Sequence, residues 1–179
     1  MTQSRIAGLV AALALVTMLG APALAVADET FKARLRGFQE VPAISTEASG
    51  EFRAKLNEDE TSIEYRLSYE NLSGTVSQGH IHIGQLSVNG GITVWLCQTT
   101  TNVDPTGLAP TCPQSGTVEG TITAANVIAI AAQGVAAGEF AELVDAIRAG
   151  VTYANVHTLP QFGGGEIRGQ IRKGKEDGD

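Results

Sequence analysis

Three histidines are the residues of this chain best suited to chemistry. His80 and His82 stand one residue apart in GHIHIG, and His157 follows much later in YANVHT. Residues i and i+2 of a strand lie on the same side of it, and a histidine from another strand can complete a zinc or copper site, because neutral imidazole suits both ions. The spacing predicts a three-histidine metal site with Glu166 or water in the fourth position.

The same three histidines have other interpretations. Polar side chains on a strand commonly hydrogen-bond to backbone carbonyls or to neighbouring side chains, and here they could also pair with Glu166. Histidine titrates near pH 6.5, so a pH-sensing role would use the same residues. The sequence leaves a metal site, a hydrogen-bonded polar cluster and a pH sensor open.

No catalytic motif accompanies the histidines. A hydrolytic triad needs a serine or cysteine beside a histidine, and Ser77 is the nearest in sequence but lies in no nucleophile elbow. FGGGE precedes a predicted strand rather than a helix, so its glycines indicate a loop and not a phosphate cradle. None of these residues therefore points to a particular reaction.

Period-two alternation of apolar and polar residues predicts the elements that position the histidines. About eight strand candidates are separated by Gly, Pro, Asn and Ser: TFKARLR, GEFRAKL, SIEYRLSYE, GHIHIG, GITVWLC, GTVEGTI, GVTYANVH and GEIRGQIR. Strands of this number and length are typical of an all-β fold, an antiparallel β-sandwich or Greek-key barrel. Ile81, Val156 and Ile167 belong on the core face, which turns the histidines and Glu166 to the outer face.

A short helical insertion interrupts the strands at about residues 124–149. Thr123 is a plausible N-cap for a first short helix, and Gly150 is a plausible stop for a second. Four apolar residues recur at helical spacing in the second: Phe140, Leu143, Val144 and Ile147. That stripe must be buried, so we expect this helix to pack on the sheet or to cover one end of a barrel.

The first 27 residues have the features of a cleaved secretory signal. Arg5 precedes an apolar run that is short for a membrane span, and Ala25-Val26-Ala27 fits the cleavage pattern. Cleavage removes one basic and no acidic residue, so the net charge of −7 becomes −8. That charge disfavours nucleic acid and anionic membranes as partners. We expect a mature domain over 28–173, no membrane span after cleavage, and a charged flexible tail over 174–179.

The two cysteines, Cys97 and Cys112, are predicted to form a disulfide. An even cysteine count in an exported chain favours a disulfide over metal ligation. The segment between them is rich in Thr, Pro and Gly and has no strand or helix periodicity. A disulfide here would close a long loop.

Several stretches occur together in the order found in one family: FQEVPAISTEASGEF, HIHIG, GTITAANV, and YANVHTLPQFGGGEIRGQI. On these residues the chain resembles the CHRD (chordin-type) domain family, in the manner of single-domain secreted microbial members. The resemblance implies a secreted, periplasmic or extracellular β-rich module with no established catalysis and an unknown protein or cell-envelope partner. No cofactor is implied. Zinc or copper binding by the histidines remains the alternative function, and a structural matrix role remains a third.

Overall fold

The computed structural model describes residues 29–174, so the predicted signal at 1–27 and the tail beyond Gly174 lie outside the described residues. A single antiparallel sheet dominates the described chain, as predicted. Its strands are β1 (Glu29–Arg36), β2 (Ser49–Leu56), β3 (Ile63–Glu70), β4 (Thr75–Ile83), β5 (Gly91–Cys97), β6 (Gly116–Ile122), β7 (Thr152–Leu159), β8 (Phe162–Gln170) and the short β9 (Arg172–Lys173). No helix in the part of the chain that the structure describes is long and apolar enough to cross a bilayer.

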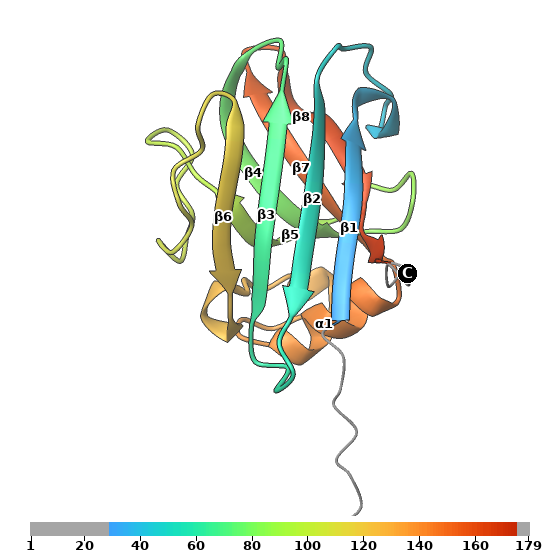
Figure 1. The fold of residues 1–179 in the computed structure, drawn as a ribbon, viewed down its shortest axis with the longest axis vertical. Coiled ribbons are helices and arrows are strands. Elements are labelled where there is room, and N and C mark those ends of the chain that lie inside the picture. The colour runs from blue at the N-terminus through green and yellow to red at the C-terminus, as the bar shows by residue number, and fades with distance from the viewer. Residues whose placement is uncertain (1–28, 175–179) are drawn as a thin grey trace, which may run out of the picture.

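The sheet folds into two walls that form a nearly closed barrel. Its strand order is β5-β4-β7-β8-β1-β2-β3-β6, with β9 paired to β1. Strands β1, β2, β3 and β6 make the front wall in Figure 1, and β4, β5, β7 and β8 make the rear wall. The walls join where β1 pairs with β8 at Arg36 and Arg168. Each strand therefore has one face toward the interior of the barrel and one face away from it.

The core fills the space between the walls and follows the alternation seen in the sequence. Phe52 pairs with Leu67 across β2 and β3, and both are fully buried. Ile81 of β4 and Ile167 of β8 are fully buried from the opposite wall. Tyr65 spans the core, because its hydroxyl donates to the Leu96 carbonyl at 2.6 Å. The phenol is thus satisfied inside an otherwise apolar interior.

Helix α1 (Phe140–Arg148) covers the lower end of the barrel in Figure 1. Its four predicted stripe residues are all buried, which confirms the amphipathic pattern. Gly150 has φ +68°, the left-handed conformation expected of a glycine that ends a helix. The helix therefore contributes its apolar face to the same core as the sheet.

The first half of the insertion forms shorter turns than predicted. Two 3-10 turns, η2 (Ala124–Asn126) and η3 (Ala131–Gln133), replace the first short helix; a third, η1 (Gly37–Gln39), follows β1. The backbone between η2 and η3 bonds elsewhere: Ile128 donates to the Thr93 carbonyl on β5. The Ile128 amide is therefore satisfied by the sheet rather than by a continuing helix.

The predicted disulfide is confirmed. Cys97, at the end of β5, is bonded to Cys112, and the bond closes a loop with a sequence separation of 15. Inside that loop the buried carboxylate of Asp104 accepts hydrogen bonds from the amides of Thr106, Leu108 and Ala109. The loop is thus organised by one carboxylate as well as by the covalent bond.

Candidate metal centre

Two neighbouring strands, β4 and β7, bring the three histidines together. In their register His80 lies opposite Asn155, and His157 lies opposite Gln78. A β-bulge between Val76 and Gln78 shifts the pairing beside His157. One ring nitrogen from each histidine lies within 4.8 Å of the other two. Residues 77 positions apart in the chain thus share one cluster.

The spacing of the three rings matches what one metal ion requires. Tetrahedral zinc with Zn–N bonds of about 2.0–2.1 Å places ligand nitrogens about 3.3 Å apart and imidazole centroids roughly 5 Å apart. His80 Nδ1 lies 3.3 Å from His157 Nε2. The three centroid separations are 5.0, 5.5 and 6.0 Å. The nitrogens, which lie within 4.8 Å of one another, must approach to about 3.3 Å for all three to bind one ion.

The cluster lies on the wall face that points away from the core, as the alternation predicted, but this face is not exposed to solvent. His80, His82 and His157 are 0, 7 and 5% exposed. Two loops cross this face: in the loop after β1, Glu40 accepts a hydrogen bond from Asn155. Asn89, in the loop after β4, donates to the Val41 carbonyl of the loop after β1. The expected outer sheet face is therefore a second, polar interior.

Backbone carbonyls determine which nitrogen of two histidines carries the proton. His82 Nδ1 lies 3.0 Å from the Gly90 carbonyl, and His157 Nδ1 lies 3.0 Å from the Gly163 carbonyl. A carbonyl oxygen only accepts, so both Nδ1 atoms are protonated and both Nε2 atoms keep a free lone pair. Metal-binding histidines are commonly oriented in this way, by a hydrogen bond from the nitrogen that does not bind the metal.

Burial keeps the cluster uncharged. Desolvation, with smaller contributions from His157 and His82, lowers the pKa of His80 to about 2. Desolvation also lowers the pKa of His82 to about 4, and it lowers the pKa of His157. All three imidazoles are therefore neutral at neutral pH, which is the form that binds metal ions.

Three buried polar atoms in this region lack a hydrogen-bond partner within the described residues. They are Nε2 of His80, Nε2 of His82 and Nε1 of Trp95. The Trp95 indole packs edge-on against His80, with the ring centroids 4.3 Å apart. An unsatisfied buried polar group costs about 1–3 kcal/mol. An ion bound to Nε2 of His82 would remove that cost for His82.

Comparison with known families agrees with the sequence motifs. The family model of the CHRD domain matches residues 31–171. The chain belongs to the CHRD domain family. The matched range contains all three histidines and both cysteines. Searches among curated proteins and among solved structures gave no match.

Glu166, the predicted fourth ligand, makes a different set of contacts in this CHRD domain. It is fully buried, and its carboxylate accepts hydrogen bonds from the Thr46 hydroxyl, the Ser73 amide and the Thr158 hydroxyl at 2.6–2.8 Å. It is not part of the group whose nitrogens converge. Although desolvation acts to raise the pKa of Glu166, these hydrogen bonds hold it below its usual value. Glu166 thus connects β8 and β7 to two loops.

A stack of one aromatic and one cationic side chain borders the histidine cluster beside His82. This stack was not predicted from the sequence. The Tyr153 ring lies parallel to the His82 ring at 4.7 Å, and the Arg168 guanidinium lies 4.3 Å from the Tyr153 centroid. Both residues alternate in phase with the histidines, so strand parity places them on this face, but it does not predict their stacking. Burial raises the pKa of Glu40 to about 7, although nearby Arg168 and the bond from Asn155 act to lower it.

Proposed function

We propose that this CHRD domain is a secreted module that binds one zinc or copper ion through His80, His82 and His157. The observation that carries the proposal is the convergence of three neutral, buried imidazoles, two of them with an unpartnered Nε2 atom. The three histidines are hydrogen-bonded through their other nitrogens, but the described residues offer these two Nε2 atoms no partner. Glu166 is left out of the proposed ligand set because its oxygens already accept three hydrogen bonds.

Three histidine ligands support a buried metal site. Three protein ligands leave a fourth position, which zinc sites with three histidines fill with water. The carbonyls of Gly90 and Gly163 orient two of the rings before any ion enters, so less conformational freedom is lost on binding. Export of the domain is part of the proposal and is supported by the disulfide and by the signal-like sequence at residues 1–27.

The test is the metal content of the whole chain, produced with its own N-terminal segment in an exporting host. Elemental analysis should find close to one zinc or copper ion per chain, and the triple variant His80→Asn, His82→Asn, His157→Asn should contain none. The matched control is Thr158→Val. Thr158 is a buried polar residue of β7, the strand that carries His157, and it is outside the proposed ligand set.

A thermal-shift titration of the metal-free wild-type protein makes the test independent of how the variants fold. An ion that binds only the folded state raises the melting temperature in proportion to the logarithm of its concentration. Metal-free protein whose melting temperature ignores added zinc and copper would overturn the proposal and make the cluster purely structural.

A further inference from the structure

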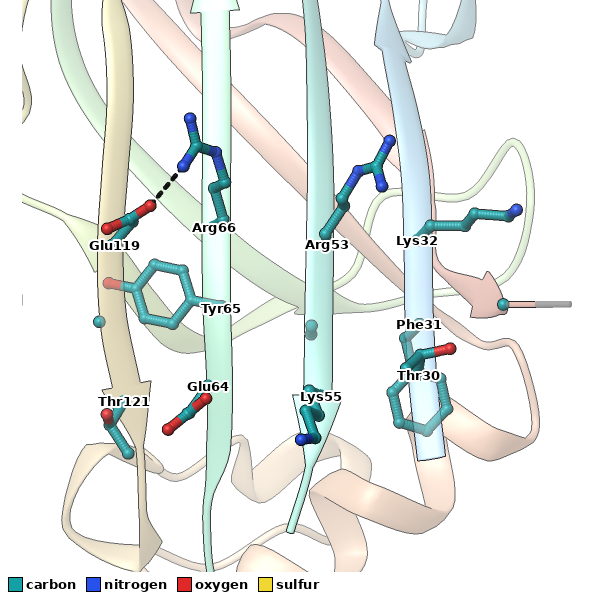
Figure 2. A pocket seen from close by; sticks show the side chains of 13 residues that line it. Thr30, Phe31, Lys32, Arg53, Lys55, Glu64, Tyr65, Arg66, Glu119 and Thr121 are labelled. Atoms are coloured by element: carbon teal, nitrogen blue, oxygen red, sulfur yellow. Dashed lines mark hydrogen bonds and ion pairs between the residues drawn. The ribbon is translucent and has the colours of Figure 1, made fainter. Parts of the chain in front are cut away.

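The three histidines are buried outside the core, and the groove on the front wall does not reach them. That groove is lined by residues of β1, β2, β3 and β6, including Tyr65 and Thr121 (Figure 2). The apolar core lies between this groove and the histidines, which are on the far face of the rear wall. The way to the cluster is therefore through the loops that cross that far face.

One of these loops, residues 84–90 between β4 and β5, contacts a histidine directly. The Gly90 carbonyl accepts the hydrogen bond from Nδ1 of His82. Residues 85–89 are all exposed, whereas His82 is 7% exposed. A segment that buries few apolar side chains can open while the rest of the domain stays folded. This loop can therefore move without unfolding the sheet.

Asn89 fastens the loop through both ends of its side chain. Its Nδ2 atom donates to the Val41 carbonyl of the loop after β1 at 3.1 Å, and its Oδ1 atom accepts from Arg168 at 2.9 Å. Arg168 also donates to the Val88 carbonyl at 3.3 Å. Asn89 itself is exposed, so it acts on the fold through these bonds rather than through burial. One side chain thus joins the loop to a second loop and to β8.

The loop and the ring of His82 also share the tyrosine of the neighbouring strand. The Gly90 amide donates to the Tyr153 hydroxyl at 3.2 Å, and the Tyr153 ring lies parallel to the His82 ring. Arg168 lies over the Tyr153 ring as well. If the loop moves away, Nδ1 of His82 loses its acceptor and Tyr153 loses a partner. Opening the loop would therefore both expose His82 and free its ring to turn.

We propose that residues 84–90 form a lid over the metal centre and that Asn89 is its latch. While the latch is closed an ion neither enters nor leaves; when the bonds of Asn89 break, the lid lifts from His82 and the ion exchanges with solvent. The effect on metal exchange rests on the proposed function, whereas the opening of the lid is a property of the metal-free chain. Since the latch holds the lid in both the metal-free and the loaded protein, it sets the rate of exchange and leaves the affinity almost unchanged.

Diethyl pyrocarbonate tests the lid without any metal, because it acylates neutral imidazole and the chain has three histidines, all in the cluster. The probe is added to the untagged full chain with a chelator present, and ultraviolet absorbance follows the acylated histidine. Wild-type protein should react slowly, and Asn89→Ala about tenfold faster, the effect expected for two lost hydrogen bonds. The control is Gln85→Ala, an exposed residue of the same loop whose side chain makes no hydrogen bond within the described residues; it should react as wild type does.

Low concentrations of urea distinguish opening of the lid from unfolding of the whole domain. Global unfolding exposes much surface and is strongly favoured by urea, whereas opening of a short loop exposes little. The acylation rate should therefore stay nearly constant well below the unfolding midpoint. A rate that rises in step with the unfolded population, rapid acylation of wild type, or equal rates for Asn89→Ala and Gln85→Ala would overturn the lid.

Transfer of zinc to a chelator tests the consequence for the metal centre. Asn89→Ala should still hold one ion but should both release and take up zinc about tenfold faster than wild type. A weaker affinity with an unchanged uptake rate would make Asn89 an ordinary structural residue and would overturn the latch. Wild-type protein that binds no zinc or copper would contradict the proposed function, and the acylation rates would still decide whether the lid exists.

Discussion

The Nδ1 atom of His80 lies 3.3 Å from the Nε2 atom of His157, which is both a hydrogen-bond distance and the separation of two nitrogens on one tetrahedral ion. His157 already donates from Nδ1 to the Gly163 carbonyl, so its Nε2 atom accepts the proton of His80 when no ion is bound. The pair can exchange this hydrogen bond for two metal bonds with little movement once the His80 proton has moved from Nδ1 to Nε2, since only an unprotonated nitrogen binds an ion.

Copper(II) should quench the fluorescence of Trp95, the only tryptophan of the chain. Its indole is in ring contact with His80, so a paramagnetic ion on that histidine would lie next to the fluorophore. We expect emission to fall steeply until one equivalent of copper is added and to level off afterwards. Prior loading with zinc should delay the quenching, and the variant His82→Gln, His157→Gln should lose the sharp end point. Quenching that is equally sharp in that variant would argue against the site.

Acid should destabilise the metal-free protein in a particular pH range. Burial keeps three histidines neutral in the folded state, with pKa values of about 2 for His80 and about 4 for His82 and a lowered pKa for His157. Unfolded histidines titrate near 6.5, so unfolding between about pH 5 and 6 takes up nearly three protons. Glu40 opposes this, because burial raises its folded pKa to about 7 and unfolding then releases about one proton.

The net uptake of about two protons means that the free energy of unfolding falls as the pH falls, by about 3 kcal/mol per pH unit in that range. Urea denaturation at several pH values, with a chelator present, measures this slope. Glu40→Gln removes the opposing contribution and should steepen the slope to about three protons. A stability that is constant or that rises toward pH 5 would contradict the uncharged state of the cluster.

Glu166→Gln should separate a structural role from a ligand role. Oε1 of Glu166 accepts from Thr46 and Ser73, and Oε2 accepts from Thr158. The substitution replaces one of these oxygens with an NH2 group, which cannot accept the bonds made to that oxygen. We expect a loss of about 1–3 kcal/mol in unfolding free energy and an unchanged metal content. Elemental analysis and urea denaturation of the same preparation give both numbers. A metal content that drops together with stability would return Glu166 to the ligand set.

The disulfide should contribute to stability but not to metal binding. Replacing Cys97 and Cys112 by serine removes the constraint on a loop with a sequence separation of 15. A loop of this length corresponds to about 3 kcal/mol in the chain-entropy account. Denaturation of the wild-type and double-serine proteins measures the loss. Retention of one ion by the double-serine protein is expected, since both cysteines belong to the apolar core cluster on the other face of the wall.

Strand parity explains why the fold class and the shared outer face of the histidines could be predicted. Alternation in GHIHIG assigned Ile81 to the core and the histidines to the opposite face, and the structure agrees. Strand parity depends only on neighbouring residues, so it can be read from a single sequence. The helical spacing of apolar residues is equally local, and it predicted the buried stripe of α1 correctly.

The burial of the cluster could not be predicted, because it depends on where two distant loops run. Glu40 and Asn89 belong to loops whose paths follow from the strand order, and local patterns do not determine that order. The contacts of Glu166 have the same origin: its partners Thr46 and Ser73 are more than 90 residues away in the chain. Parity put Glu166 on the correct face but could not state its distance from the histidines.

The most direct test of the central claim is X-ray absorption spectroscopy at the zinc edge of the zinc-loaded full-length protein. The account predicts a first shell of three imidazole nitrogens at about 2.0–2.1 Å with one further light atom, and imidazole scattering reduced to two rings in His157→Gln. A shell made of oxygens alone, or one that is unchanged in His157→Gln, would contradict a site built from His80, His82 and His157.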